Sequence, residues 1–213
     1  MVKHVWFDMG GTLYKETPEF KAVHDKHLYA TYARLVGEQH IAKAKLDYDA
    51  LYKQYGSNSA VFRSLGMPSD FWHKAFDELD VSSLLSPDFD TISTLKAIKK
   101  TLPISLFTNI KPNTIKNVLA HLQIPITDFT YIISGDDIKE RKPNLEGFHK
   151  MVELTNLPPD EIMYVGDRID VDIKPAKAVG MKTCLVWSSS DEADHSAGTF
   201  SELKDILANA SLL

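Results

Sequence analysis

Short runs of apolar residues, each ending in polar groups, recur along the chain and predict buried strands. The first run covers residues 2–7 and leads into Asp8 and the pair Gly10 and Gly11. Glycine readily adopts the positive φ angles that a tight turn after a strand can require, so the pair marks the end of this strand. Three later runs end in the same way: residues 104–109, 131–136 and 162–167. The carboxyl ends of parallel strands meet at one edge of a sheet, so we expect one shared site there.

The segment between Tyr14 and about Ser86 has a different pattern, which predicts helices and no strand. Its apolar residues recur at three- and four-residue spacing. Two such faces consist of Leu28, Tyr32 and Leu35, and of Tyr48, Tyr52 and Tyr55. Tyrosines at this spacing are typical of packing between helices. Gly56 and Met67–Pro68 interrupt the pattern, because glycine often ends a helix and proline disfavours helix in the residue before it.

From about Asp88 onward, predicted strands alternate with amphipathic helices, which indicates a parallel sheet with right-handed crossovers. Pro112 and Pro143 fit first helical turns, where the missing N–H costs nothing. We therefore expect a Rossmann-like three-layer α/β core at residues 1–14 and 87–213, with an inserted all-helical domain at residues 15–86.

The last part of the chain predicts one more strand and one more helix. Residues 182–187 indicate a fifth buried strand, and Cys184 within it is expected to be a core residue. Residues 188–195 are typical of a polar loop, and a last helix is expected near residues 200–208. A single cysteine cannot form an internal disulfide.

Four short motifs follow one another in order, and each coincides with the end of a predicted strand or the loop after it. They are Phe7 to Leu13, Leu106 to Asn109, Lys142 with Pro143, and Gly166 to Ile173 with its continuation Ala178 to Met181. Each alone is weak evidence, but chance rarely supplies all four at compatible spacing. On these residues the chain resembles the haloacid dehalogenase superfamily of aspartate-nucleophile hydrolases. Many of its members insert a helical cap after the first motif, and residues 15–86 are expected to be that cap.

The resemblance implies a site for phosphoryl transfer. Asp8 would attack phosphorus and form an acyl phosphate that water hydrolyses, which splits one difficult step into two. An anionic nucleophile meets an anionic substrate, so cations and hydrogen-bond donors must neutralise both. Lys142 would bridge Asp8 and the phosphate, while Thr108 and the backbone N–H of Asn109 would hold phosphate oxygens. Two further residues of the first motif are expected to contact the phosphate: Gly11 and Thr12.

The resemblance also implies a bound Mg²⁺, which prefers a few oxygen ligands and retained waters. The expected ligands are Asp8, the carbonyl of Gly10 and Asp167, with Asp172 as a ligand or as a group that orients metal-bound water. The two later aspartates are also compatible with simple capping of the helix that is expected to begin near Asp170. Lys142 lies in a charged run and is equally compatible with a solvated surface lysine.

The first motif departs from the pattern of the superfamily's phosphatases at Gly10. Those enzymes have a second aspartate two residues after the nucleophile, which protonates the leaving oxygen and later activates water. Loss of a positioned acid-base group typically costs ~10²–10⁴ in rate, so Gly10 puts turnover in doubt.

Three interpretations of Gly10 remain open. A phosphatase could recruit an acid-base group elsewhere, for instance Glu16 or His24, or rely on water and a good leaving group. A phosphonatase-like enzyme would need a cap lysine that forms a Schiff base, and the candidates are Lys15, Lys43, Lys45 and Lys53. A domain that binds a phosphorylated ligand without turnover is the third possibility. The dehalogenase branch works without metal, so the retained Asp167 and Asp172 argue against it.

The composition agrees with an enzyme acting on a small phosphorylated metabolite. The chain has 213 residues, enough for one domain with an insertion, and a formal net charge of −5. An anionic surface gives no sign of affinity for nucleic acid or anionic lipid. No apolar stretch approaches the ~20 residues of a membrane span, and the N-terminus lacks the pattern of a signal peptide. We expect a cytoplasmic protein that is a monomer or a homodimer.

Overall fold

The structure, a computed structural model, describes residues 1–79 and 81–210. It divides into two compact units. One is formed by Met1–Lys15 together with Ser86–Leu213, and the other by Glu16–Leu85. The first unit contains a parallel sheet and is called the core unit. The regular elements described in the second are all helical, and it is called the helical unit.

The sheet of the core unit has six strands in the order β3-β2-β1-β4-β5-β6. The strands are β1 (His4–Phe7), β2 (Ile104–Phe107), β3 (Ile132–Ile133), β4 (Ile162–Gly166), β5 (Lys182–Val186) and β6 (His195–Ala197). Every pairing is parallel, and Val5 of β1 lies opposite Ile104 on one side and Met163 on the other. All four residues of β1 are buried, as expected for a strand that is covered on both faces.

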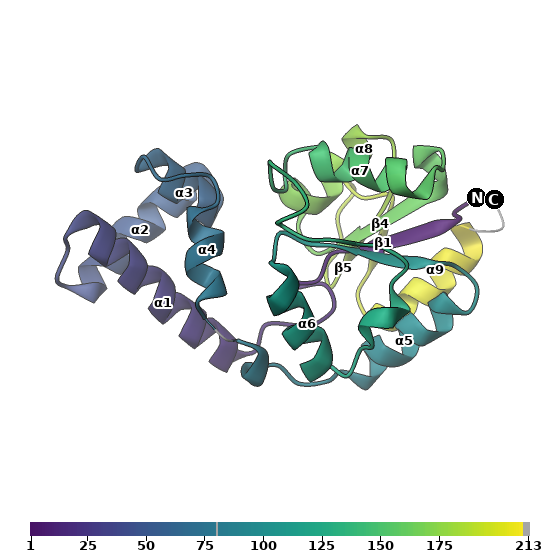
Figure 1. Cartoon of the computed structure of the whole chain (residues 1–213), viewed down its shortest axis with the longest axis horizontal. Coiled ribbons are helices and arrows are strands. Elements are labelled where there is room, and N and C mark those ends of the chain that lie inside the picture. The colour runs from purple at the N-terminus through teal and green to yellow at the C-terminus, as the bar shows by residue number, and fades with distance from the viewer. Residues whose placement is uncertain (80, 211–213) are drawn as a thin grey trace. The chain divides into compact units, whose positions relative to one another are not determined.

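Helices cover both faces of this sheet, as Figure 1 shows. α7 (Glu146–Thr155) and α8 (Lys174–Ala178) lie on one face, and α5 (Phe89–Lys99), α6 (Pro112–His121) and α9 (Leu203–Ala210) lie on the other. Successive residues of β1 serve opposite faces. Trp6 packs in one cluster with Phe148 of α7, whereas the ring of Phe7 lies 6.0 Å from that of Phe200. The predicted three-layer α/β core is confirmed.

Short helical turns complete the core unit and connect its main elements. They are η2 (Ile126–Asp128), η3 (Pro159–Glu161), the π-helical turn η4 (Ile169–Ile173) and η5 (Phe200–Glu202). η4 is separated from the end of β4 by two residues and leads into α8. It therefore holds the second half of the fourth motif close to the carboxyl edge of the sheet.

In the described part of the helical unit, residues 16–79 and 81–85, there are four α-helices and one short turn. These are α1 (Pro18–Val36), α2 (Ile41–Tyr55), α3 (Asn58–Ser64), α4 (Phe71–Asp77) and η1 (Ser82–Leu84). Its buried core includes Leu28, Tyr32, Tyr48, Phe62 and Trp72. Of the second predicted face, Tyr48 is buried, but Tyr52 and Tyr55 are 44% and 41% exposed. Packing of that stripe was therefore predicted correctly only for its first member.

The predicted helix breaks are confirmed in the helical unit. Gly56 ends α2 with a φ of 77°, and its N–H donates a hydrogen bond to the carbonyl of Tyr52. This left-handed conformation suits glycine at a helix C-terminus. Pro68 lies between α3 and α4.

Two local predictions in the core unit are wrong. Pro112 does begin α6, but α7 begins at Glu146, so Pro143 lies in the preceding loop and not in a first helical turn. The polar loop was predicted to run through His195, but in the structure it ends one residue earlier, because His195 begins the edge strand β6. That strand has only three residues, of which Ala197 alone is buried, so it leaves no apolar run to detect.

Within residues 1–79 and 81–210, no helix is both long enough and apolar enough to cross a bilayer.

Candidate active site

Three polar residues follow directly on three neighbouring strands and meet at one edge of the sheet. Asp8 follows β1, Thr108 follows β2 and Asp167 follows β4. The backbone extends the ladder past the strand ends. The N–H of Asp8 donates to the carbonyl of Val165 at 2.9 Å, and the N–H of Thr108 donates to that of Ile133 at 3.0 Å. Asp8 and Thr108 are each only 2% exposed.

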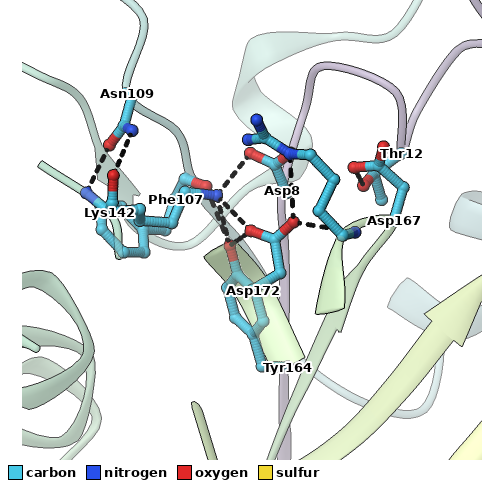
Figure 2. Close-up of polar contacts among 9 residues, drawn as sticks. Asp8, Thr12, Phe107, Asn109, Lys142, Tyr164, Asp167 and Asp172 are labelled. Carbon is cyan, nitrogen blue, oxygen red and sulfur yellow. Dashed lines mark hydrogen bonds and ion pairs between the residues drawn. The ribbon is translucent and has the colours of Figure 1, made fainter. Parts of the chain in front are cut away.

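Lys142 is the cation at the centre of this site (Figure 2). Its Nζ donates hydrogen bonds to Asp8 Oδ1 at 2.7 Å and to Asp172 Oδ1 at 2.7 Å. It also lies 2.8 Å from the hydroxyl of Tyr164. The Lys142 and Asp172 side chains have no exposed surface, so Lys142 is not a solvated lysine. Asp172 does cap the turn that follows β4, since its Oδ2 accepts from the N–H of Arg168 at 3.2 Å, but its Oδ1 also binds Lys142.

Asn109 fixes the backbone of Lys142 with a pair of hydrogen bonds. Its Oδ1 accepts from the N–H of Lys142 at 2.9 Å, and its Nδ2 donates to the carbonyl of the same residue at 3.1 Å. The Nε of Arg141 donates in turn to the carbonyl of Asn109 at 3.2 Å. The second and third motifs are thereby joined, with a positioning role for the Asn109 side chain that the sequence did not suggest.

Tyr164 is the residue of this site that sequence reasoning missed. Its hydroxyl contacts Lys142 and lies 3.3 Å from Asp172 Oδ1 and 3.4 Å from the carbonyl of Phe107. A signal was present, because Tyr164 is the polar-tipped residue of an otherwise apolar buried strand, and a buried tyrosine hydroxyl usually has a partner. Burial, supported by Asp172, raises its pKa well above the usual range, so the hydroxyl stays protonated.

The fourth motif packs tightly against the turn after β1. Thr12 donates its hydroxyl to Asp167 Oδ1 at 3.2 Å. Gly11 has a φ of 80°, and a Cβ at this position would lie only 2.8 Å from the Cγ of Asp167. A Cβ at Gly166 would likewise lie 2.8 Å from the Cγ of Asp172. The glycines therefore let two carboxylates approach the backbone closely, and contact of Gly11 and Thr12 with phosphate stays a prediction.

Asp8, Asp167 and Asp172 form a cluster of negative charge that the protein neutralises only in part. Each offers a carboxylate oxygen, and these oxygens lie within 4.8 Å of one another. Burial raises the pKa of Asp8, with Lys142 opposing the shift. Burial, followed by repulsion from Asp8 and Asp172, raises the pKa of Asp167 to about 7. The Nε of Arg168 lies 3.8 Å from Asp172 Oδ2, but its side chain is 53% exposed.

This donor set fits a divalent metal ion. Within residues 1–79 and 81–210, no cationic side chain forms an ion pair with Asp167. Oxygen ligands in a small group are the kind that Mg²⁺ prefers. A dication beside Asp8 and Asp167 would offset the repulsion that raises the pKa of Asp167.

Packing does not require a glycine at position 10. A Cβ at this position would have its nearest neighbour, the Tyr14 hydroxyl, at 3.5 Å, and the next, Ile110 Cδ1, at 3.9 Å. Both are ordinary van der Waals distances, so a side chain could begin here without displacing its neighbours. The role of the Gly10 carbonyl as a metal ligand stays a prediction.

Three of the cap residues named above, His24, Lys43 and Lys45, have charged partners within the helical unit. The Nδ1 of His24 lies 3.0 Å from Asp25 Oδ1, and its ring packs edge-on against Trp72. Hydrogen bonding to Glu38 raises the pKa of Lys43, and hydrogen bonding to an aspartate raises that of Lys45. A Schiff-base lysine must lose its proton, so these shifts run opposite to what that chemistry requires.

The family model for haloacid dehalogenase-like hydrolases matches residues 5–186, which include all four motifs and the segment between the first two. The chain belongs to this family. Membership of the haloacid dehalogenase-like hydrolases accounts for the order of the motifs along the sequence and for the fold that carries them.

Curated relatives of this hydrolase include two phosphatases. A glyceraldehyde 3-phosphate phosphatase of Methanocaldococcus jannaschii is 32% identical over 135 residues, which cover 60% of this chain and 59% of the relative. A phosphoglycolate phosphatase of Escherichia coli O157:H7 is 27% identical over 202 residues, which cover 84% of this chain and 79% of the relative. The first alignment therefore spans less than two thirds of the relative's length.

Solved structures of other haloacid dehalogenase-like proteins share the fold. A phosphatase of this class from Thermococcus onnurineus has a TM-score of 0.71 at 21% identity, and the match covers 97% of this chain and 98% of that one. A 2-haloacid dehalogenase from Pseudomonas syringae has a TM-score of 0.62 at 21% identity, with 98% and 99% covered. Because phosphatase and dehalogenase both match, the fold alone does not select the reaction.

Proposed function

We propose that this hydrolase is a Mg²⁺-dependent phosphatase that acts on a small phosphorylated metabolite through an aspartyl-phosphate intermediate at Asp8. The observation that carries the proposal is the buried Lys142, whose Nζ lies 2.7 Å from both Asp8 and Asp172 at the carboxyl edge of the sheet. The names of the two curated phosphatase relatives support a phosphate monoester as substrate.

Asp8 would supply the attacking oxygen. Lys142 holds one carboxylate oxygen of Asp8 in place, which orients the carboxylate and lowers the repulsion that an incoming phosphate meets. Thr108 and the backbone N–H of Asn109 are positioned after β2, where they would donate to phosphate oxygens. Attack forms the bond between an Asp8 oxygen and phosphorus and breaks the ester bond. Water then cleaves the acyl phosphate and restores the carboxylate.

Asp8, Asp167 and Asp172 would hold Mg²⁺, with the Gly10 carbonyl as the further ligand that the family resemblance implies. When bound, the ion supplies positive charge that offsets the phosphate and the carboxylate cluster. Thr12 keeps the Asp167 carboxylate oriented through its hydroxyl. Tyr164 and Asp172 keep the Lys142 ammonium directed toward Asp8.

The helical unit, Glu16–Leu85, would serve as the cap that excludes water and selects the substrate. The domain division predicted from the sequence and the assignment of the cap belong to this proposal. Of the four lysines named for the phosphonatase alternative, Lys43 and Lys45 are the weaker candidates, because both are exposed, ion-paired and raised in pKa.

The test is Mg²⁺-dependent release of phosphate from p-nitrophenyl phosphate, phosphoglycolate and glyceraldehyde 3-phosphate. We expect native turnover that EDTA abolishes and that Asp8→Asn eliminates. Asp170→Asn is the matched control, because Asp170 lies in the same motif but its side chain is 82% exposed and pairs with Lys174. Rapid acid quench followed by mass spectrometry should find phosphate on the peptide that contains Asp8.

A Gly10→Asp variant separates a phosphatase from a binding domain. A native protein that is inactive and becomes active with this single change would contradict the proposal and indicate a phosphate site without turnover. Native activity that survives Asp8→Asn would contradict the assignment of the nucleophile.

A further inference from the structure

The turn after β1 brings Tyr14 back beside Gly10. The N–H groups of Thr12 and Leu13 both donate to the carbonyl of Met9, at 3.3 and 3.0 Å, and close a tight turn. Gly10 and Tyr14 then form a bridge between their backbones. A hydrogen bond from Trp187 Nε1 to the carbonyl of Thr12, at 3.2 Å, further stabilises this turn.

The side chain of Tyr14 lies over the glycine. Its hydroxyl is 3.5 Å from the point where a Cβ of residue 10 would stand, and the residue is only 6% exposed. A carboxyl group at position 10 would extend from that same point. The phenol therefore places a proton donor next to the location that the missing side chain would occupy, two residues from Asp8.

We propose that the Tyr14 hydroxyl protonates the leaving oxygen of the substrate in place of an acid at position 10. This inference rests on the proposed phosphatase function. An alkyl phosphate releases a strongly basic alkoxide, so its cleavage needs a proton, and tyrosine is among the side chains that supply one. Of the other donors considered, His24 already pairs with Asp25 and packs against Trp72 within the helical unit.

The step balances in atoms and charge. In the first half-reaction an Asp8 oxygen bonds to phosphorus, the ester P–O bond breaks, and the proton of the Tyr14 hydroxyl moves to the leaving oxygen. In the second, a water oxygen bonds to phosphorus, the bond to Asp8 breaks, and a proton of that water returns to the Tyr14 phenolate. Tyr14 and Asp8 thus end each cycle as they began it.

The experiment compares substrates whose leaving groups differ in their need for a proton. p-Nitrophenyl phosphate releases a weakly basic phenolate, whereas phosphoglycolate and glycerol phosphate release alkoxides. We expect Tyr14→Phe to lower kcat on an alkyl ester at least about 100-fold and kcat on the aryl ester less than about threefold. The ring is kept, so a purely structural role would affect both substrates alike. Tyr52→Phe, at an exposed tyrosine of the helical unit, is the matched control.

A double variant makes the test independent of any damage that Tyr14→Phe causes to the fold. Gly10→Asp has room for its Cβ and would supply a carboxyl donor beside Tyr14. Adding Gly10→Asp to Tyr14→Phe should restore alkyl-ester turnover to within about tenfold of native.

The outcomes separate the two proposals. If the native protein hydrolyses both kinds of ester and Tyr14→Phe lowers both equally, or neither, the assignment of Tyr14 is refuted while the phosphatase function stands. Native hydrolysis of the aryl ester alone also refutes Tyr14 as the donor. If the native protein releases phosphate from no ester, the phosphatase function fails and the role of Tyr14 fails with it.

Discussion

Replacing Asp167 by asparagine should stabilise the metal-free protein, although it removes a residue of the proposed metal site. Burial and repulsion from Asp8 and Asp172 raise the pKa of Asp167 from 3.8 to about 7. At about 1.4 kcal/mol per pKa unit, the ionised Asp167 costs the folded state at most about 4 kcal/mol near neutral pH. Asparagine removes this charge and keeps an oxygen that can accept from Thr12, whose hydroxyl now donates to Asp167 Oδ1.

Relaxation and water penetration reduce such figures, so we expect a gain of about 1–2 kcal/mol, or roughly 3–6 °C in Tm for a chain of this size. The sign follows from the raised pKa. The folded state binds the Asp167 proton more tightly than the unfolded state, so its stability falls as pH rises from about 4 to about 7. The advantage of Asp167→Asn should therefore be full above pH about 7 and should disappear as pH falls toward about 4.

The assay is urea unfolding in EDTA at three pH values across this range, repeated with saturating Mg²⁺. Bound metal stabilises the native protein in proportion to the logarithm of its concentration over Kd, and this gain should be largely lost in the variant. Mg²⁺ should thus reverse the order of stability. The control is Asp170→Asn, whose side chain is 82% exposed in the native protein. A variant that is less stable than native in EDTA above pH 7, or whose advantage does not change with pH, would refute the reasoning.

Three further predictions address the core of the site and its support. Lys142→Met should lower the free energy of unfolding by about 3 kcal/mol in EDTA, because two buried carboxylates lose their shared cation; an unchanged urea midpoint would contradict this. Burial lowers the pKa of His4 from 6.5 to about 4. The contribution of neutral His4 to the free energy of unfolding is therefore fully present above pH 6.5. About 3 kcal/mol of it should be lost as pH falls toward 4, and unfolding of His4→Gln should depend less steeply on pH. Gly11→Ala should destabilise the protein by about 1–3 kcal/mol and weaken Mg²⁺ binding, since its Cβ would overlap the Asp167 carboxylate. Gly37→Ala has a similar φ of 75° and no atom within 4 Å, so a loss of Mg²⁺ binding there would point to backbone strain and not to this overlap.

The main features of the fold were predictable because short stretches of the sequence carry the patterns that indicate them. The apolar runs that predicted strands correspond to β1, β2, β3, β4 and β5. A run in which successive residues are all apolar indicates a strand that is buried on both faces. The strands of a three-layer parallel sheet are buried in this way. The edge strand β6 escaped detection, because a three-residue strand that is mostly half-buried needs few apolar residues.

The positions of the candidate site residues were predictable to the same extent. Asp8, Thr108 and Asp167 stand at strand ends, and the parallel arrangement alone brings strand ends to one edge. The predicted roles of these residues in substrate and metal binding stay predictions. What the sequence left open at Lys142 was whether it is solvated or buried, since the charged run around it is compatible with either.

The sequence by itself determined the strands β1 to β5, their order of appearance, the break at Gly56 and the strand-end acids, because each depends on neighbouring residues. Only the tertiary structure decided the partners of Lys142, the hold of Asn109 on its backbone and the contact of Tyr164 with its ammonium. Those contacts join segments that lie 22 to 134 residues apart in the chain. The Tyr14 hydroxyl is a more local case, because it reaches Gly10 through a turn of only four residues, but the structure was needed to show the 3.5 Å approach. Spacing along a sequence records which residues share a face, but the approach of two side chains from different elements depends on the packing of the whole core.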